Sequence, residues 1–414
     1  MKKVRFILIG LFVLMTCFTS VALMAGENGQ KPDLLIWSGE ALYNVRQQVL
    51  TGKPGDFKAA VDDIKADADA ALKQEPVSVV YKKSTPPSGD KHDYTSIGIY
   101  WWPNPNTPDG KPYIRKDGQV NPEVNNDTFD KNTLGKMSGA VQALSLGYYV
   151  TGNPAYAEHA AKLVKVWFLD PATRMNPNLN YGQFVPGVND GRKEGIVETL
   201  TLVNLAEAVT LIVGTPAFSQ ADFAQLKEWY KAYLKWLIES KIGKAEAAAT
   251  NNHGTWYDFQ VAAYAVYTGQ ADLAKKLIQN TDLRLAAQLD AEGKMPQEMS
   301  RTRSVHYHLY NLRAFISLAI LGDKVGVDIW NYKTADGRGI QKAIDFLAPF
   351  LEGKQTWPGE QINKAENEAS SALYFRYAAV RYHNPRYAAI ANLLLGDEVK
   401  TSRTNLFFPE PVMK

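Results

Sequence analysis

The stretch TLGKMSGAVQALSLGYYVTG, residues 133–152, is followed two residues later by AYAEHAAKLVKVWFL, residues 155–169. Apolar residues recur in both at the three- and four-residue spacing of an α-helix. Between them, the segment Tyr149–Gly152 ends in the residue type that most often terminates a helix. The two stretches therefore predict a pair of antiparallel helices joined by a tight glycine turn.

The same pattern recurs along the chain. Helical periodicity is found at 36–50, 57–73, 195–212, 222–240, 257–269, 271–289, 305–321, 340–351, 368–383 and 386–396. Further turns are predicted at Tyr267–Gly269, Leu321–Asp323 and His383–Pro385. Strand-like alternation is scarce. Repeated helical hairpins stack side by side, and we expect an all-α fold: an (α/α) toroid or barrel built from stacked antiparallel helical hairpins, as a single domain over residues 26–414.

Two long segments interrupt the helical pattern, at about residues 85–129 and 171–192. Both are rich in Pro, Gly and Asn, and loops of this length in compact domains are usually functional or disordered. The first contains the aromatic cluster Tyr94, Tyr100, Trp101, Trp102 and Tyr113, which argues against disorder. We expect both segments to be active-site loops.

Residues 1–25 have the composition of a secretory signal peptide. Basic residues at the start precede an apolar run that ends in small residues near Ala22 and Ala25, although a retained membrane anchor is the alternative. The one cysteine, Cys17, lies in this run, and its neighbours argue against a lipoprotein cleavage site. We expect a periplasmic or secreted protein without disulfides or stable membrane insertion after cleavage.

The charge balance excludes one class of partner. Without Lys2, Lys3 and Arg5, the 46 basic residues fall to 43, equal to the 43 acidic residues. A neutral chain gives no overall attraction for nucleic acid. Affinity for an anionic ligand would have to come from a local cluster.

The segment ATNNHGTWYDFQ, residues 249–260, is the first candidate for such a cluster. Thr255 and Asp258 resemble a capping box, which predicts a helix start at Thr255. Asn251, Asn252 and His253 would then lie at the positive end of the helix dipole, where a neutral imidazole suits a proton acceptor. The segment is either a polar helix start or, in addition, one wall of an active site.

A second candidate is MPQEMSRTRSVHYHLYNLRAF, residues 295–315. For a helix beginning near Ser300, Arg303, Tyr307 and Asn311 share one face, and a guanidinium near a phenol stabilises its phenolate. A surface stripe or a buried polar network would show the same spacing. His306 and His308 diverge on a helix, so we expect no metal site.

The two loops combine aromatic side chains with cations. Lys111, Arg115 and Lys116 lie among Trp101, Trp102 and Tyr113, and the second loop ends at Arg192 and Lys193. Aromatic faces stack on sugar rings and cations meet carboxylates, whereas a structural reading packs the aromatics under the loop and leaves the cations solvated.

Together these motifs resemble the alginate lyase family of polysaccharide lyases. The resemblance rests on Asn-Asn-His before a helix, on the later run Glu298, Arg301, Thr302, Ser304 and Tyr307, and on both loops, which look like those of Bacteroides-type members. It covers roughly Asp93–Ala314, with Trp357–Ile362 as a weaker match. It implies an (α/α) toroid and a lyase for 4-linked polyuronates, with mannuronate-rich alginate preferred and glucuronan as the alternative.

The resemblance also implies site residues. The expected catalytic residues are Asn252, His253, Arg301 and Tyr307. The expected substrate contacts are Tyr94, Trp101, Trp102, Lys111, Arg115, Tyr181, Gln183, Arg192, Asn251, Trp256, Arg303 and Trp357. Spacing leaves open whether Arg301 or Arg303 binds the substrate carboxylate. No metal or other cofactor is expected, because amide and guanidinium groups would neutralise that carboxylate.

The implied reaction is β-elimination at C5 and C4 of a uronate, which gives an unsaturated end. Asn252 and Arg301 would neutralise the carboxylate, Tyr307 would protonate O4, and either His253 or Tyr307 would take the C5 proton. Two rivals remain: a toroidal glycoside hydrolase using two of Asp258, Glu298 and Glu360, and a non-catalytic glycan-binding protein.

Overall fold

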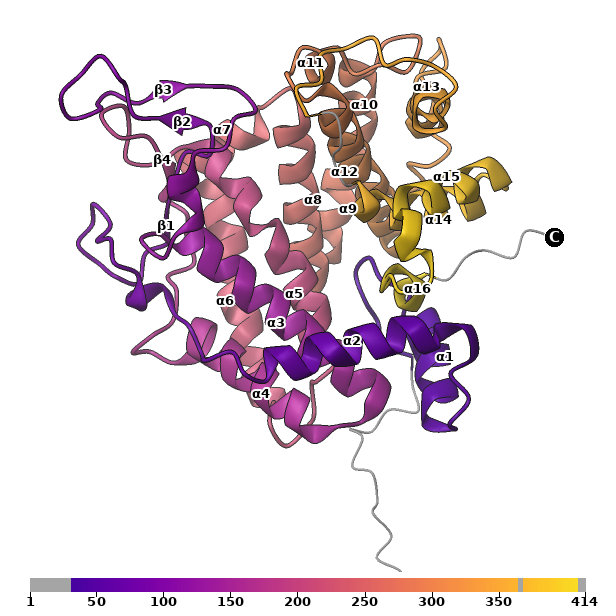
Figure 1. Ribbon diagram of the computed structural model, residues 1–414, viewed down its shortest axis with the longest axis horizontal. Coiled ribbons are helices and arrows are strands. Elements are labelled where there is room, and N and C mark those ends of the chain that lie inside the picture. Colours follow the sequence, from indigo (N-terminus) through magenta and orange to yellow (C-terminus); the bar gives the residue numbers. More distant parts are fainter. Residues whose placement is uncertain (1–30, 364–367, 409–414) are drawn as a thin grey trace, which may run out of the picture.

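The computed structural model describes residues 31–363 and 368–408, and within these ranges the regular structure is almost entirely helical (Figure 1). The expected all-α class is confirmed. The predicted signal peptide lies outside the described residues. None of the helices in these two ranges combines the length and apolar character needed to cross a bilayer.

The α-helices are α1 Gly39–Leu50, α2 Lys58–Ala71, α3 Asp130–Thr151, α4 Pro154–Val164, α5 Thr201–Thr210, α6 Gln220–Glu239, α7 Lys241–Ala247, α8 Asn252–Tyr267, α9 Ala271–Gln279, α10 Thr281–Gln288, α11 Pro296–Met299, α12 Ser304–Val325, α13 Ile340–Leu351, α14 Ala372–Arg381, α15 Pro385–Leu395 and α16 Thr404–Phe407. The strands are β1 Thr95–Ile97, β2 Trp101–Trp102, β3 Ile114–Arg115 and β4 Tyr181–Phe184.

An inner set of helices forms a ring. Helix α3 contacts α5, α5 contacts α8, α8 contacts α12 and α12 contacts α14, while α16 touches both α14 and α1, and α1 returns to α3. Outside this ring, α2 and α4 pack on α3, α6 and α9 on α8, α13 on α12, and α15 on α14 (Figure 1). The expected toroid of stacked hairpins is therefore confirmed.

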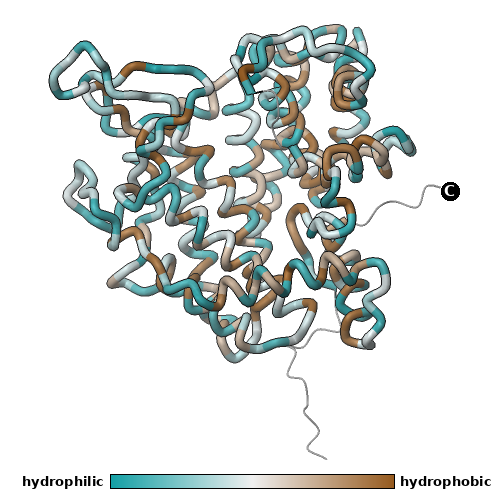
Figure 2. Tube along the Cα trace, viewed as in Figure 1, coloured by the Kyte–Doolittle hydropathy of each residue, from teal (hydrophilic) through white to brown (hydrophobic). Residues whose placement is uncertain are grey.

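Sequence composition explains which helices lie inside. Helices α3, α8 and α12 are buried around most of their circumference, and each is apolar with little amphipathicity. Helix α2 instead buries one stripe, Ala60, Val61, Ile64, Ala68 and Ala71. A helix that is apolar all round must lie in the core, whereas a striped helix covers it. In Figure 2, brown and teal segments alternate along many of the helices, as expected for helices that bury one apolar stripe.

The first predicted hairpin is present with its expected caps. Gly152 has φ +76° and its N–H donates to the Tyr148 carbonyl, and Asn153 then caps α4, which begins with Pro154. The turn predicted at Leu321–Asp323 is wrong, because α12 continues to Val325 and ends at Gly326. Gly322 instead allows the chain after α12 to pack closely against the helix, because a Cβ on it would lie 2.4 Å from the Val327 carbonyl oxygen.

The two long loops pair with each other. Strand β1 from the first loop lies parallel to β4 from the second, and β2 pairs with β3 within the first. A buried ion pair anchors the start of the first loop, where Lys82 Nζ lies 3.1 Å from Asp130 Oδ2 at the beginning of α3. The same carboxylate oxygen accepts the N–H of Thr95 at 2.9 Å. The loops are thus held as one structured layer at one end of the helices (Figure 1).

Candidate active site

Four segments enclose a cavity of about 610 Å³ at the end of the toroid where the loops lie. Its lining consists of Ile99, Tyr100, Trp101 and Arg115 from the first loop, Gln183, Arg192, Glu194 and Val197 from β4 and the segment after it, Asn251, Asn252 and His253 from the start of α8, and Gln297, Ser300, Arg301, His306, Tyr307 and Tyr310 from α11 to α12. All four residues expected to be catalytic lie in this one cavity.

His253 lies in the first turn of α8 and is held by a carboxylate from α7. Its Nδ1 is 2.6 Å from Glu246 Oε1, and Glu246 is fully buried. The carboxylate oxygen accepts a hydrogen bond from Nδ1–H, which leaves Nε2 of this tautomer free to accept a hydrogen bond or a proton. The structure therefore holds the His253 imidazole in one orientation, through a partner seven residues away that the sequence analysis missed.

The predicted helix start is wrong by three residues. Helix α8 begins at Asn252 with Asn251 as its N-cap, so Thr255 and Asp258 form no capping box. Thr255 is buried and donates to Gln288 Oε1, and Asp258 pairs with Arg284. The buried Glu298 carboxylate occupies the helix N-terminus instead, where it complements the dipole.

Glu298 also fixes the side chain of Asn252. Its two carboxylate oxygens accept the backbone N–H and the Nδ2–H of Asn252, both at 2.7 Å. Burial raises the pKa of Glu298, although both hydrogen bonds oppose the rise. Asn252 is 1% exposed, so its amide is held in one orientation at the cavity wall before any ligand arrives.

Arg301 lies just before α12 and makes two kinds of contact. Its Nε and Nη2 donate to the two carboxylate oxygens of Asp117 at 3.1 and 2.8 Å, and its guanidinium lies 3.7 Å from the centre of the Tyr307 ring. Burial alone would raise the pKa of Asp117, but the hydrogen bonds and charge of Arg301 hold it below its usual value.

The helical face proposed from Arg303 to Asn311 is therefore wrong. Helix α12 begins at Ser304 with Arg303 as its N-cap residue. The backbone of Arg303 forms an isolated antiparallel β-bridge with Gln361. Asn311 is fully buried and donates to Gln288 Oε1. Of the two arginines left open by spacing, Arg301 is the one that lines the cavity.

Tyr307 is buried, and its hydroxyl lies 2.9 Å from that of Tyr100. Burial, reinforced by Tyr100, raises the pKa of Tyr307 above its ordinary value, and the opposing charge of Arg301 is the weaker influence. A guanidinium does favour the phenolate as expected, but it belongs to Arg301 and its effect on the pKa of Tyr307 is outweighed by burial. Near neutral pH the Tyr307 side chain is therefore a protonated phenol.

A second imidazole also lines the cavity. His306 Nδ1 lies 2.7 Å from Glu368 Oε1, and its ring stacks on Tyr310 at 5.8 Å between centroids. His306 was not among the site residues expected from the sequence, although its position next to Tyr307 in the chain could have indicated it. His308, in contrast, is buried away from the cavity, and burial lowers its pKa to about 4.

The loops supply the opposite wall. Arg192 Nη2 donates to Gln183 Oε1 at 2.8 Å, and its guanidinium lies 5.8 Å from the centre of the Trp101 ring. Gln183 has φ +47°, and its N–H donates to Ser96 Oγ at 2.7 Å. Strained backbone of this kind persists where the surroundings enforce it, often at functional sites. Trp101, Arg115, Gln183, Arg192 and Asn251 are the expected substrate contacts that lie in this cavity.

Other expected substrate contacts lie elsewhere. Tyr94 is fully buried and donates to Glu198, and Trp256 packs against Phe259 and Tyr310. Trp357 donates to Ser304 Oγ within an aromatic cluster. Tyr94 and Trp256 are buried, so a sugar cannot stack on their rings and these two expectations are corrected, whereas Trp357 is half-buried and lies outside the described lining of the cavity. Trp102, Lys111, Tyr181 and Arg303 are also outside the described lining of the cavity.

Within the two described ranges, no three His, Cys, Asp or Glu side chains are grouped so that they could hold a metal ion. The polar groups of the cavity are instead amides, imidazoles, phenols and guanidinium groups.

Comparison with known proteins identifies the family. The sequence profile of the alginate lyase family matches residues 78–357. The chain belongs to the alginate lyase family. A crystal structure of an alginate lyase from Bacteroides ovatus superposes with a TM-score of 0.86 at 39% identity, covering 91% of this chain and 99% of that one. The family resemblance drawn from the sequence motifs is thereby confirmed.

Alginate lyases of Pseudomonas are more distant members. Those of Pseudomonas entomophila and Pseudomonas fluorescens are 29% and 36% identical over 114 residues, which is 27% of this chain. The matched part spans about 30% of the length of each of these relatives.

Proposed function

We propose that the protein is a polysaccharide lyase that cleaves 4-linked polyuronate by β-elimination, with mannuronate-rich alginate as its first substrate. One observation carries the proposal: a single cavity brings together an oriented imidazole, a protonated phenol, a fixed amide and a guanidinium group. Family membership and the structural match to the Bacteroides ovatus alginate lyase support the same reaction class.

Asn252 and Arg301 would neutralise the uronate carboxylate. Removal of the C5 proton places a second negative charge next to this carboxylate, so donors held in position before the reaction stabilise the transition state. Glu298 holds the Asn252 amide and Asp117 holds the Arg301 guanidinium. Loss of one such preorganised donor typically costs about 10²–10³ in rate.

Tyr307 would carry the proton transfers for a mannuronate unit, whose C5 proton and O4 lie on the same side of the ring. The C5–H and C4–O4 bonds break and a C4–C5 double bond forms. The phenol receives the C5 proton and gives its own proton to O4. A hydroxyl that exchanges one proton for another stays neutral overall, which agrees with the raised pKa of Tyr307.

His253 offers the alternative base. In a guluronate unit the C5 proton and O4 lie on opposite sides of the ring, so a second group must take the C5 proton while Tyr307 protonates O4. The Glu246 contact prepares His253 for this task. A glucuronate unit has the same-side arrangement of mannuronate, so glucuronan is the alternative substrate with an unchanged mechanism.

The positions of the carboxylates argue against the hydrolase alternative. Two carboxyl groups about 5–10 Å apart across the cleft would be required. In the described lining of the cavity, Glu194 is the one carboxylate side chain. Glu298 is bonded to Asn252, and Asp258 is paired with Arg284 outside this cavity.

Incubation with defined polymannuronate, polyguluronate and glucuronan tests the proposal. A lyase produces unsaturated ends that absorb in the ultraviolet, a hydrolase produces new reducing ends without this absorbance, and a binding protein produces neither. Product formation that continues at the wild-type rate after Tyr307→Phe would refute the mechanism.

We also propose that the protein acts in the periplasm or outside the cell, on the basis of the composition of residues 1–25. N-terminal analysis of the protein recovered from the periplasmic fraction of a bacterial host tests this. A chain that starts at residue 23 or 26 supports it, and an uncleaved cytoplasmic chain contradicts it.

A further inference from the structure

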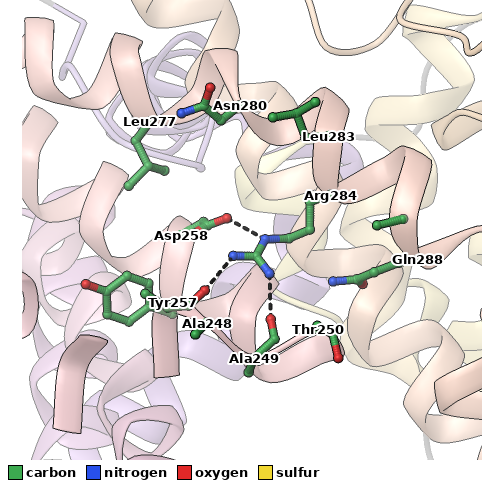
Figure 3. Close-up of a pocket in the computed structure, with 12 residues that line it drawn as sticks. Ala248, Ala249, Thr250, Tyr257, Asp258, Leu277, Asn280, Leu283, Arg284 and Gln288 are labelled. Atoms are coloured by element: carbon green, nitrogen blue, oxygen red, sulfur yellow. Dashed lines mark hydrogen bonds and ion pairs between the residues drawn. The ribbon is translucent and has the colours of Figure 1, made fainter. Parts of the chain in front are cut away.

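The segment that carries Asn251, Asn252 and His253 has a second face that the mechanism does not use. Behind it, a cavity of about 460 Å³ opens on the outer side of the toroid, between the end of α7, the start of α8 and helix α10 (Figure 3). Polar side chains of α10 extend across the floor of this cavity and contact the backbone of the segment.

Arg284 makes three contacts, one to a side chain and two to backbone carbonyls. Its Nε lies 2.6 Å from Asp258 Oδ2 on α8, its Nη1 donates to the Ala249 carbonyl at 2.7 Å, and its Nη2 donates to the Ala247 carbonyl at 3.1 Å (Figure 3). The side chains of Arg284 and Asp258 are each 16% exposed. One guanidinium therefore ties α10 to the last turn of α7 and to the first turns of α8.

Gln288 extends the same arrangement one helical turn along α10. Its Nε2 donates to the Asn251 carbonyl at 3.2 Å and to Thr255 Oγ1 at 3.1 Å. Together with Arg284, it binds the carbonyls of three alternate residues: Ala247, Ala249 and Asn251. We refer to Arg284, Asp258 and Gln288 as the α10 brace.

Gly254, which follows the Asn-Asn-His triplet, leaves the space that the brace needs. A Cβ on Gly254 would lie 2.2 Å from Arg284 Nη1 and 2.1 Å from the Ala249 carbonyl oxygen. Any side chain at this position would therefore compete with the guanidinium. The conformation of the catalytic segment and the contacts behind it depend on each other.

We propose that the α10 brace is a positioning device for the imidazole of His253. Glu246 lies on α7 and His253 on α8, so their 2.6 Å contact depends on the relative placement of two helices joined by a four-residue connection. The brace binds that connection and both helix ends from behind. Arg284, Asp258 and Gln288 are positioning residues, since the contacts described here reach the cavity only through Glu246 and the Asn251–His253 segment. The effect on catalysis rests on the lyase activity proposed above.

The main test is Arg284→Met, assayed for polymannuronate cleavage. Partners that orient a catalytic group typically contribute 10–100-fold in activity, so kcat should fall by about that factor while KM changes little. Arg284→Lys should retain part of the activity, because an ammonium group cannot reproduce the planar fork of donors. Arg386→Met is the matched control, since it removes a bidentate contact from α15 to Glu352 at the end of α13, and neither residue belongs to the described lining of either cavity. An equal loss in the control, or a loss confined to KM, overturns the proposal.

A double-mutant cycle with Glu246→Gln separates positioning from general destabilisation. If the brace acts through the Glu246–His253 contact, Arg284→Met should cost much less in the Glu246→Gln background than in the wild type. Equal costs in the two backgrounds overturn the proposal. Should Arg284→Met fail to fold, Asp258→Asn keeps the side-chain shape, removes the charge and should give a smaller loss with the same dependence on Glu246.

A spectroscopic readout keeps this test independent of the proposed activity. The hydrogen-bonded Nδ1–H of His253 should give a downfield proton resonance in the NMR spectrum that Glu246→Gln abolishes. Arg284→Met should weaken or broaden this resonance and Arg386→Met should leave it unchanged. An unchanged resonance in Arg284→Met refutes the brace even if the wild-type protein cleaves no polyuronate, whereas a changed resonance supports it.

Discussion

Replacing Glu207 by Gln should stabilise the protein at alkaline pH. Glu207 lies on α5 beneath the segment that leads into α1, where its Oε1 accepts the N–H groups of Ile36 and Trp37 at 2.5 and 2.8 Å. Its Oε2 is buried and has no hydrogen-bond partner within the described residues. Burial raises the pKa of Glu207 from 4.5 to about 7, against the backbone hydrogen bonds that lower it.

The direction in which the free energy of unfolding changes with pH follows from proton linkage. Between pH 4.5 and about 7 the folded state holds the Glu207 proton and the unfolded state does not, so the free energy of unfolding decreases as the pH rises through this window. The difference between the two pKa values corresponds to about 3 kcal/mol. A glutamine retains the accepting oxygen and carries no charge, so the variant should match the wild type near pH 4 and exceed it by about 3 kcal/mol at pH 8.

Urea unfolding followed by circular dichroism at pH 4.5, 6 and 8 measures the difference. Glu239→Gln on α6 is the matched control, because its side chain is 63% exposed and such surface changes usually stay within about 0.5 kcal/mol. If Glu207→Gln is less stable than the wild type at pH 8, or if the gap between them does not widen with pH, the reasoning is refuted.

Three predictions concern the candidate active site. Tyr307→Phe should lower kcat on polymannuronate by about 10²–10⁴, the usual contribution of a positioned acid–base group; ultraviolet-detected kinetics measure this, and a loss below tenfold would contradict it. Asn252→Ala should lower kcat by about 10²–10³ while thermal unfolding shows that the fold persists; unchanged kcat would exclude the amide from the mechanism. Asp117→Asn, which releases Arg301 from its ionic partner, should reduce kcat/KM by about tenfold, the lower end expected for an orienting partner. An equal loss of kcat/KM in Asp127→Asn, an exposed control on the same loop, would show that Asp117 has no special role.

Local sequence signals predicted most of the architecture. The helical periodicity and the Gly152 turn correctly indicated stacked hairpins, because the spacing of apolar residues and the residue that ends a helix are both local features of the sequence. A predicted boundary failed where a tertiary partner acts beside the local cap, which for α8 is Asn251. Helix α8 starts three residues early because Glu298, 46 residues away, binds its first N–H group.

The cavity residues Asn252, His253, Arg301 and Tyr307 were also predictable, since they belong to short motifs in the sequence. Their partners were not. Tyr100 meets Tyr307 across 207 positions of sequence and Asp117 meets Arg301 across 184, and no local pattern encodes contacts at such separations.

The aromatic residues show the same limit most clearly. Tyr94 and Trp101 stand seven positions apart in one loop, yet one is sealed in the core and the other lines the cavity. Periodicity, turns, composition and short motifs in the sequence by themselves predicted a helical toroid, a rich set of aromatic side chains and a candidate acid–base site. Only the packing of the two loops on each other and on the helices decided which of those side chains a sugar can reach, because burial depends on neighbours from distant parts of the chain.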